Sequence, residues 1–430
     1  MRFGVNYTPS SGWFYTWLKP DWDSIRRDLD AIKGLGVDHV RLFPLWPVLQ
    51  PNRTWINEDG LADVRHMAML ASERELDVYS DVLQGHLSSF DFVPSWLVSW
   101  HEGSMFTDDN AVAAEAKLVS ALYDALADIP HFKGLNIGNE CNQFADATHP
   151  RRMAADEHGV QAWLEALMAP VHQKAHANGH VLMHSENDAI WYEDGHPFTS
   201  RQACNIGDIS IIHSWVFNGT AQHYGPLSAQ SLRHAEYLAE LSKAFADDPG
   251  RQVWLQEIGA PQNVIDEADT PEFCRKTVEH VLDCENLYGI TWWCSHDVNR
   301  GMKDFPVFEH DLGLFDEQGE LKPIGKAFAG LARQYRDMPE PAARRQAIVV
   351  KVGQDGNAVL KSACAPGGSV FERWMEMSEA GQRPALVSSA QAVDRDFCKA
   401  RGIEECIEVP MTPGLQYNAV SDPSLESKKQ

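Results

Sequence analysis

Short apolar runs alternate with longer amphipathic segments over the first 335 residues of the chain. In the longer segments apolar residues recur every three or four positions, as at Ile25, Leu29 and Ile32, which is the spacing of a helix with one buried face. The short runs predict eight strands, at residues 3–7, 39–43, 78–83, 132–137, 180–184, 209–213, 253–256 and 290–294. Helices are predicted at residues 22–35, 61–74, 111–126, 160–177, 231–245, 271–287 and 325–334.

Eight strand–helix repeats predict a (β/α)8 barrel, the TIM-barrel fold of the α/β class. The competing architecture is an open, doubly wound sheet, which is expected to carry a glycine-rich phosphate-binding turn after its first strand. Here the first strand is followed only by Pro9, Ser10, Ser11 and Gly12. The sequence therefore favours the barrel, in which functional residues lie at the C-terminal ends of the strands.

The pattern changes after residue 335. Residues 336–346 contain two prolines and three arginines and predict a linker. Beyond it, strands at 347–351, 385–388 and 405–409 alternate with helices at 370–380 and 392–400, which predicts a small α/β, Rossmann-like subdomain. Its glycines do not form the dinucleotide-binding fingerprint, so we expect no nucleotide there. The predicted division is a barrel domain (1–335), a linker (336–346), a subdomain (347–415) and a tail (416–430).

Two carboxylic acids stand out because each follows a predicted strand. Glu140 comes after the fourth strand, next to Asn139, and Glu257 comes after the seventh. A single Glu in such a place is more often a solvated loop residue. Two of them, three strands apart in a barrel, would face each other across its mouth. A pair of carboxylic acids is what the cleavage of a glycosidic bond requires.

Composition and charge narrow the range of substrates and partners. The formal net charge of -24 argues against a nucleic-acid partner and suggests a neutral substrate. The 14 Trp residues suit sugar binding, although most Trp in any protein are core anchors. The 8 Cys have no metal-ligand spacing, and His172 and His176 lack a third ligand, so we expect no metal and no cofactor. Without an export signal or a membrane-spanning apolar run, we expect a cytoplasmic protein that does not contact a membrane.

Residues 3–335 resemble the clan A glycoside hydrolases, within which the chain is most similar to family 5 and to its subfamily 18 β-mannosidases. The resemblance rests on the Asn139-Glu140 pair after strand four and on Glu257 after strand seven. It implies that Glu140 is the acid/base, that Glu257 is the nucleophile and that Asn139 binds the sugar 2-hydroxyl. It also implies that Arg41 orients the nucleophile. His213 matches a histidine that is common in the clan.

Two Trp residues are part of the same resemblance. Trp215 stands where the clan often has a Tyr that bonds the nucleophile, and this departure leaves that contact in doubt. Trp293 ends a Gly-x-x-x-Trp pattern and is implied to form the floor of the sugar site. Further candidates for binding sugar hydroxyls follow other strands: His86, Asn187, His296 and Asp297.

Physical chemistry supports some of these roles and leaves alternatives for others. An Arg inside an apolar strand is costly unless it is paired, so Arg41 fits a place beside Glu257, but a purely structural ion pair is also possible. His213 could equally be a hydrogen-bonded core imidazole. Burial and the charge of Glu257 should raise the pKa of Glu140, which would suit a proton donor.

The sequence therefore predicts a retaining, exo-acting β-mannosidase. Its expected substrate is a small neutral β-mannoside, such as mannosyl-β-1,4-N-acetylglucosamine, from which it would remove the terminal mannose. One alternative is an endo-β-1,4-mannanase or a cellulase of the same family, and another is a barrel that binds sugar without catalysis. Because its loops are rich in Trp, we also expect a homodimer.

Overall fold

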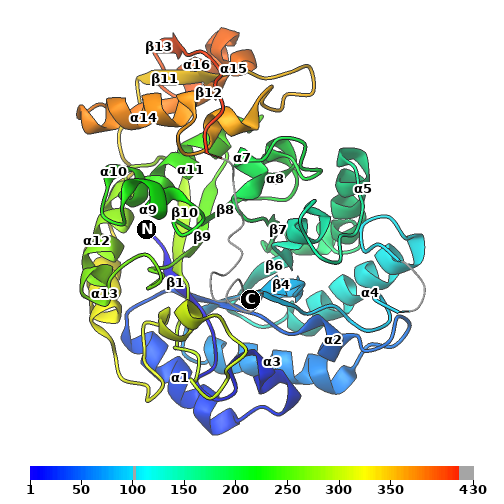
Figure 1. The fold of residues 1–430 in the computed structure, drawn as a ribbon. Helices are drawn as coiled ribbons and strands as arrows, with labels where there is room; N and C mark the ends of the chain where they lie inside the picture. The colour runs from blue at the N-terminus through cyan, green and yellow to red at the C-terminus, as the bar shows by residue number, and fades with distance from the viewer. Residues whose placement is uncertain (100–102, 416–430) are drawn as a thin grey trace, which may run out of the picture.

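The computed structural model describes residues 1–99 and 103–415, so the predicted tail at 416–430 lies outside the described residues. Eight parallel strands form the main sheet in the order β7-β6-β3-β2-β1-β10-β9-β8. β7 and β8, at the two ends of this order, also contact each other, and this contact closes the barrel (Figure 1). The strands are β1 (Phe3–Asn6), β2 (His39–Leu42), β3 (Asp77–Leu83), β6 (Phe132–Asn139), β7 (Val181–Ser185), β8 (Ser210–Ser214), β9 (Val253–Ile258) and β10 (Leu287–Trp292).

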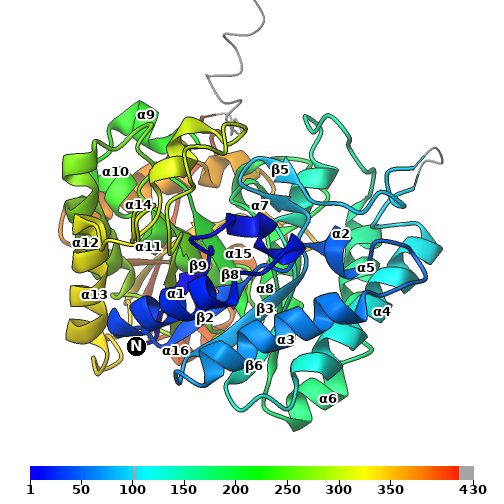
Figure 2. The same ribbon diagram turned by 90° about the horizontal axis from the view of Figure 1, so that it is seen from below.

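The predicted (β/α)8 barrel is thus confirmed, and its helices lie outside the ring of strands (Figure 2). They are α1 (Trp22–Gly34), α3 (Glu58–Ser72), α4 (Asp109–Leu126), α5 (Glu157–Met168), α6 (His172–Ala177), α8 (Ser200–Asn205), α11 (His234–Lys243), α12 (Thr270–Val281) and α13 (Pro323–Tyr335). Aspartates at the N-termini of α1, α4 and α5 accept hydrogen bonds from backbone N–H groups and so cap these helices.

Three predicted barrel helices differ from the structure. The helix expected at 271–287 ends at Val281, and Leu287 already begins β10. The helix expected at 231–245 is interrupted at Arg233, between helices at 229–232 and 234–243.

The single helix expected at 160–177 is two helices, because α5 ends at Met168 and α6 begins at His172. Pro170 lies between them, and it has no backbone N–H with which to continue a helix.

The loops after the strands carry short elements of their own. They are η1 (Trp13–Leu18), α2 (Trp46–Leu49), the hairpin of β4 (His86–Leu87) and β5 (Phe90–Asp91), η2 (Cys141–Ala145), α7 (Ala189–Tyr192), α9 (Thr220–Tyr224), α10 (Ala229–Leu232), η3 (Glu267–Asp269) and η4 (Val307–Asp311). All of these elements follow the C-terminal end of a strand, so they gather at the mouth of the barrel, where functional residues are expected.

A second, three-stranded parallel sheet has the order β12-β11-β13. It consists of β11 (Gln346–Val350), β12 (Pro384–Ser388) and β13 (Glu405–Glu408), with η5 (Lys361–Cys364), α14 (Ser369–Glu379), α15 (Ser389–Val393) and α16 (Arg395–Ala400). The helix predicted at 392–400 is instead divided between α15 and α16, because Asp394 leaves the helical conformation and its side chain caps α16.

This second sheet lies over one side of the barrel (orange to red in Figure 1). α11 lies between the barrel and this sheet, and all ten of its residues are buried. The division of the chain into a barrel domain, a linker and a subdomain stays a prediction. Among the described residues, no helix combines the length and the apolar character that a membrane span needs.

Candidate active site

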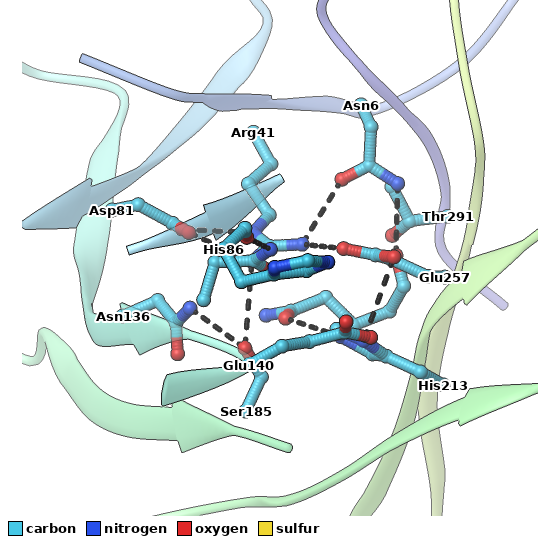
Figure 3. A network of polar contacts seen from close by, with 12 residues as sticks. Asn6, Arg41, Asp81, His86, Asn136, Glu140, Ser185, His213, Glu257 and Thr291 are labelled. Atoms are coloured by element: carbon cyan, nitrogen blue, oxygen red, sulfur yellow. Dashed lines mark hydrogen bonds and ion pairs between the residues drawn. The ribbon is translucent and has the colours of Figure 1, made fainter. Parts of the chain in front are cut away.

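The guanidinium of Arg41, on β2, is the centre of a buried polar network at the mouth of the barrel (Figure 3). Its Nε and Nη2 each donate to a carboxylate oxygen of Asp81 at 2.8 Å, a bidentate pair. Its Nη1 donates to Glu257 Oε1 at 2.8 Å, and its Nη2 donates to Asn139 Oδ1 at 2.6 Å. Arg41 and Asp81 are fully buried, and such charges are tolerated because each has a close opposite charge.

Glu140 and Glu257 reach this network from opposite sides. Glu257 lies on β9, and Glu140 follows β6 directly. The backbone N–H of Glu140 donates to the carbonyl oxygen of Ser185, and its φ of 47° lies in the left-handed region. A non-glycine residue in this conformation carries backbone strain, which is common at functional sites.

His213, on β8, lies between the two carboxylates. Its Nδ1 is 2.7 Å from Glu140 Oε1 and 3.5 Å from Glu257 Oε2, while its Nε2 is 3.3 Å from Gln256 Oε1. One oxygen of Glu140, one of Glu257 and a ring nitrogen of His213 all lie within 4.8 Å of one another. The structure therefore brings together the two acids that are 117 residues apart in sequence (257 − 140).

The imidazole changes the acidity of both carboxyl groups. Burial alone would raise the pKa of Glu140, but the hydrogen bond and the charge of His213 hold it below its ordinary value. Burial raises the pKa of Glu257, the charges of His213 and Arg41 offset part of this rise, and the charge of Glu140 adds to it. The pKa of His213 is raised: burial would lower it, but Glu257 and Glu140 outweigh that effect.

The expected rise in the pKa of Glu140 is therefore absent from the free protein. The reason is that the imidazole of His213 lies at hydrogen-bond distance, which the sequence did not predict. This contact lowers the pKa of Glu140 and raises the pKa of His213, so it favours the carboxylate of Glu140 and the protonated form of His213.

The other residues implied by the resemblance also lie at the mouth. Asn139 connects Arg41 to the β4–β5 hairpin, because its Nδ2 donates to the carbonyl oxygen of His86 at 2.8 Å. Trp293 packs against Phe43, with ring centroids 5.5 Å apart. Trp215 lies against Gly259, where a Cβ atom would come within 2.8 Å of the indole ring, so only glycine leaves room for it.

The four weaker candidates have different surroundings. His86 is half-buried, and its Nδ1 lies 3.2 Å from Asp91 Oδ1. Its charge contributes to the lowered pKa of Glu140. Asn187 accepts a hydrogen bond from Asn142 at 2.7 Å.

His296 and Asp297 make structural contacts. His296 is buried and stacks on Phe315 with ring centroids 5.1 Å apart. Asp297 forms an ion pair with Lys322 at 2.8 Å and accepts a hydrogen bond from the backbone of Gly313. A part in sugar binding for these two residues, as for His86 and Asn187, stays a prediction.

Sequence reasoning missed several residues of the site. Asp81 accepts two hydrogen bonds from the guanidinium of Arg41. It could have been found in the sequence as a charged residue inside the apolar run 78–83. Gln143 donates to Glu140 Oε2 at 2.6 Å, and it stands only three residues beyond that acid. Asn6 accepts a hydrogen bond from Arg41 Nη1 at 3.3 Å, and Glu309 accepts one from Ser88 at 3.1 Å. These two residues carried no local signal, because both are far from the two acids in sequence.

A second group of possible metal ligands lies apart from this network. Ligand atoms of Asp146, Glu193 and His196 are within 4.8 Å of one another. However, the backbone N–H of Phe198 donates to His196 Nδ1 at 3.0 Å, so the proton of the neutral ring is on Nε2. A metal ion at Nε2 would displace this last ring proton, whereas a metal-binding His normally keeps one N–H to donate. The chemistry of these donors therefore does not fit a metal ion.

Family models and curated proteins give no match to the sequence, but solved structures do. A GH5_18 structure from Bifidobacterium longum subsp. infantis is 55% identical, with 98% of this chain and 99% of that chain covered and a TM-score of 0.95. A Glu-to-Ala variant of GH5_18 from Bifidobacterium longum subsp. longum, in complex with Manβ1-4GlcNAc, is 55% identical, with 99% and 100% covered and a TM-score of 0.95. GH5_18 from Streptomyces cattleya, in complex with GlcNAc, is 47% identical, with 95% and 98% covered and a TM-score of 0.92.

A (β/α)8 barrel with two carboxylates at its mouth, together with these relatives, defines a glycoside hydrolase. Identities of this size over nearly the whole chain show the family. The chain belongs to subfamily 18 of glycoside hydrolase family 5.

Proposed function

We propose that the protein is a retaining, exo-acting β-mannosidase that removes terminal β-1,4-linked mannose from short oligosaccharides such as mannosyl-β-1,4-N-acetylglucosamine. The main support is the short distance between Glu140 and Glu257. A carboxylate oxygen of Glu140 lies within 4.8 Å of a carboxylate oxygen of Glu257. Retaining enzymes hold their carboxyl groups roughly 5–5.5 Å apart, whereas inverting enzymes need about 6.5–9.5 Å to admit a water molecule. The observed separation favours retention.

In this mechanism Glu257 is the nucleophile and Glu140 is the acid/base. A carboxylate oxygen of Glu257 attacks the anomeric carbon while Glu140 gives a proton to the departing glycosidic oxygen, which forms an α-mannosyl-enzyme. Glu140 then takes a proton from water, which attacks the same carbon from the β face and releases β-mannose. Arg41 holds Glu257 Oε1, which leaves Oε2 as the oxygen that reacts.

His213 supplies the proton reservoir for this cycle. In the free protein the raised pKa of His213 favours a proton on the imidazole, whose Nδ1 lies 2.7 Å from Glu140 Oε1. The charge of Glu257 is the largest factor that raises the pKa of His213. Glu257 loses this charge when it attacks the sugar, so the pKa of His213 falls. The proton then moves to Glu140 and on to the leaving oxygen.

Exo action is supported by aromatic side chains from the loops after β1, β3 and β10, which pack against one another at the mouth of the barrel. Phe305, from the loop after β10, lies 4.9 Å from Trp13 and 4.8 Å from Phe90, measured between ring centroids. An endo-acting mannanase or cellulase would need an open groove for further sugars on this side. The complex of a relative with Manβ1-4GlcNAc supports a short mannoside as the substrate.

A panel of aryl β-glycosides and β-1,4-linked disaccharides tests the substrate. We expect aryl β-mannosides and mannosyl-β-1,4-N-acetylglucosamine to be cleaved and polymeric mannan to be left intact. Preferred cleavage of mannan or cellulose would support the endo-acting alternative. Turnover of none of these compounds would support the barrel that only binds sugar.

Azide separates the roles of the two acids. With a dinitrophenyl mannoside, whose leaving group needs no proton, Glu140→Ala should still form the glycosyl-enzyme, and azide should then give the β-mannosyl azide. In Glu257→Ala, azide should replace the missing nucleophile and give the α-mannosyl azide. NMR of the products reads the configuration, and the opposite pattern would mean that the two roles are exchanged.

The cytoplasmic location and the homodimer expected from the sequence remain predictions. Light scattering at micromolar protein concentration measures the second one directly, and a monomer would contradict it.

A further inference from the structure

The loop after β10 crosses the mouth of the barrel and contacts loops that follow three other strands. Phe305 packs between Trp13, after β1, and Phe90, in the hairpin after β3. Three residues further on, Phe308 lies 5.2 Å from Phe217, which follows β8. The segment from Phe305 to Phe308 is therefore packed against loops on two sides of the mouth. This packing fixes the position of the short helix η4 and of its other side chains.

Glu309, on η4, is a third carboxyl group beside the two of the proposed mechanism. It is buried, and the hydroxyl of Ser88 donates to its Oε2 at 3.1 Å. Burial raises the pKa of Glu309 to about 8; hydrogen bonds from Ser88 and Trp293 oppose this rise, and the charges of Glu257 and Glu140 add to it. At neutral pH the group is therefore mostly an uncharged acid, with one O–H to donate and oxygens that accept.

The charges around Glu309 are unfavourable to its ionised form. Among residues 1–99 and 103–415, none forms an ion pair with Glu309, and the neighbouring charges that act on it are those of Glu257 and Glu140. A buried acid without a cation lowers the stability of the fold, because its ionised form is poorly solvated. Sugar hydroxyls can both donate to and accept from such a group, so a bound sugar would use the hydrogen-bonding capacity that the protein leaves available.

The position of Glu309 selects one side of the scissile bond. The leaving group lies beside Glu140, at the end of β6, because that acid supplies its proton. Glu309 accepts a hydrogen bond from Ser88 in the hairpin after β3 and lies beside Trp293, which follows β10. Trp293 packs against Phe14 and Phe43 from the loops after β1 and β2. This is the side on which the terminal sugar would lie.

Building on the proposed function, we propose that Glu309 is a substrate-binding residue that hydrogen-bonds ring hydroxyls of the non-reducing terminal sugar. Its contact is with the sugar that is released and not with the leaving group. Glu309→Ala should then weaken the hydrolysis of every substrate with the same terminal sugar by the same factor, whatever its leaving group.

Aryl β-mannosides that lack the 3-, 4- or 6-hydroxyl identify the contact. We expect Glu309→Ala to lower kcat/KM for the parent compound by roughly 10- to 100-fold, the usual effect of losing one or two hydrogen bonds. For at least one deoxy compound, kcat/KM of the wild-type protein should fall by a similar factor relative to the parent compound. For Glu309→Ala, kcat/KM should be the same with that deoxy compound as with the parent compound. Asp304→Ala removes an exposed acid from the same loop and should behave like the wild type.

Two outcomes would overturn the proposal. One is a folded Glu309→Ala with kcat/KM within about 2-fold of the wild type. The other is a set of deoxy effects that is the same in wild type and variant at all three positions. If Glu309→Ala does not fold, Glu309→Gln, which keeps the shape of the side chain, is tested with the same deoxy series and the same criterion.

Calorimetry distinguishes a failure of this proposal from a failure of the proposed function. Binding of mannosyl-β-1,4-N-acetylglucosamine to Glu140→Ala needs no catalysis, and adding Glu309→Ala should weaken this binding by roughly 10-fold or more. If the wild type cleaves no glycoside but the double variant still binds more weakly, the proposed function fails and Glu309 keeps its role. Equal binding by the two variants would contradict the role of Glu309 directly.

Discussion

At the scale of single residues, Glu240 can be compared with two other buried acids, Glu115 and Glu309. Glu240 lies among Lys243, Arg344 and Arg401, and although burial would raise its pKa, these cations lower it to about 2. In the part of the chain that the structure describes, no cation pairs with Glu115 or Glu309, and burial raises the pKa of each to about 8. The difference comes from the neighbouring charge and not from the depth of burial.

Glu115 gives a prediction about stability and pH. The indole N–H of Trp163 donates to its Oε2 at 2.8 Å. Because the pKa is raised in the folded state, the folded protein holds a proton between about pH 4.5 and 8 that the unfolded chain has lost, so stability falls as pH rises through this window. Glu115→Gln removes this effect.

Thermal unfolding at several pH values measures it. Relative to the wild type, Glu115→Gln should gain stability steadily from pH 5 to pH 8, by up to roughly 4 kcal/mol. A difference in stability that does not depend on pH would contradict the assignment.

At the scale of elements, the positions of the strands could be predicted well from the sequence. The breaks in the helices at Pro170 and Asp394 were not predicted. Apolar residues determine strand and helix periodicity over a few turns, and this signal is present in the sequence. A single residue that breaks a helix changes the outcome locally, as at Pro170, although the periodicity continues through it. The order of the strands followed from the alternation of strands and helices, because consecutive parallel strands pair as neighbours.

Gly4 shows how closely the strands approach at the bottom of the barrel. A Cβ atom here would lie 2.1 Å from the ring of His39, which is fully buried and hydrogen-bonded to Thr291 at 2.7 Å. Gly4→Ala should therefore destabilise the fold by about 1–3 kcal/mol or more, because the ring cannot move into packed surroundings.

Denaturant unfolding is the measurement for Gly4→Ala, and Gly34→Ala is its matched control. Gly34 ends α1, and nothing lies within 4 Å of the position of its Cβ, so this variant should be as stable as the wild type or up to about 1 kcal/mol more stable. Equal stability of Gly4→Ala and the wild type would show that the barrel bottom is looser than these distances imply.

At the scale of the whole molecule, the second sheet is joined to the barrel through buried charge. Arg344, just before β11, donates to Glu236 Oε1 at 2.7 Å, and Arg401, after α16, donates to Glu240 Oε2 at 3.0 Å. Both glutamates belong to α11, which has no solvent-exposed face. The second sheet thus covers what would otherwise be the outer face of a barrel helix.

Arg344→Met tests this connection. The substitution leaves Glu236 buried with weaker pairing, which should cost about 3–5 kcal/mol of unfolding free energy. Arg345→Met, at the next position, removes an exposed pair with Glu404 and should cost less than about 1 kcal/mol. The two variants are compared by denaturant unfolding, and similar losses in both would mean that the buried contact contributes little.

The sequence by itself determined the barrel and the two acids at the ends of its strands, because periodicity and strand ends are local properties that neighbouring residues express. Only the tertiary structure decided what surrounds those acids. The pairing of β2 with β3 brings Asp81 to Arg41, and the closure of the barrel places His213 between Glu140 and Glu257. The loop after β10 brings Glu309 close to the same acids from another part of the chain. Acidity and hydrogen bonding depend on distances between residues that are remote in sequence, and those distances exist only once the chain has folded.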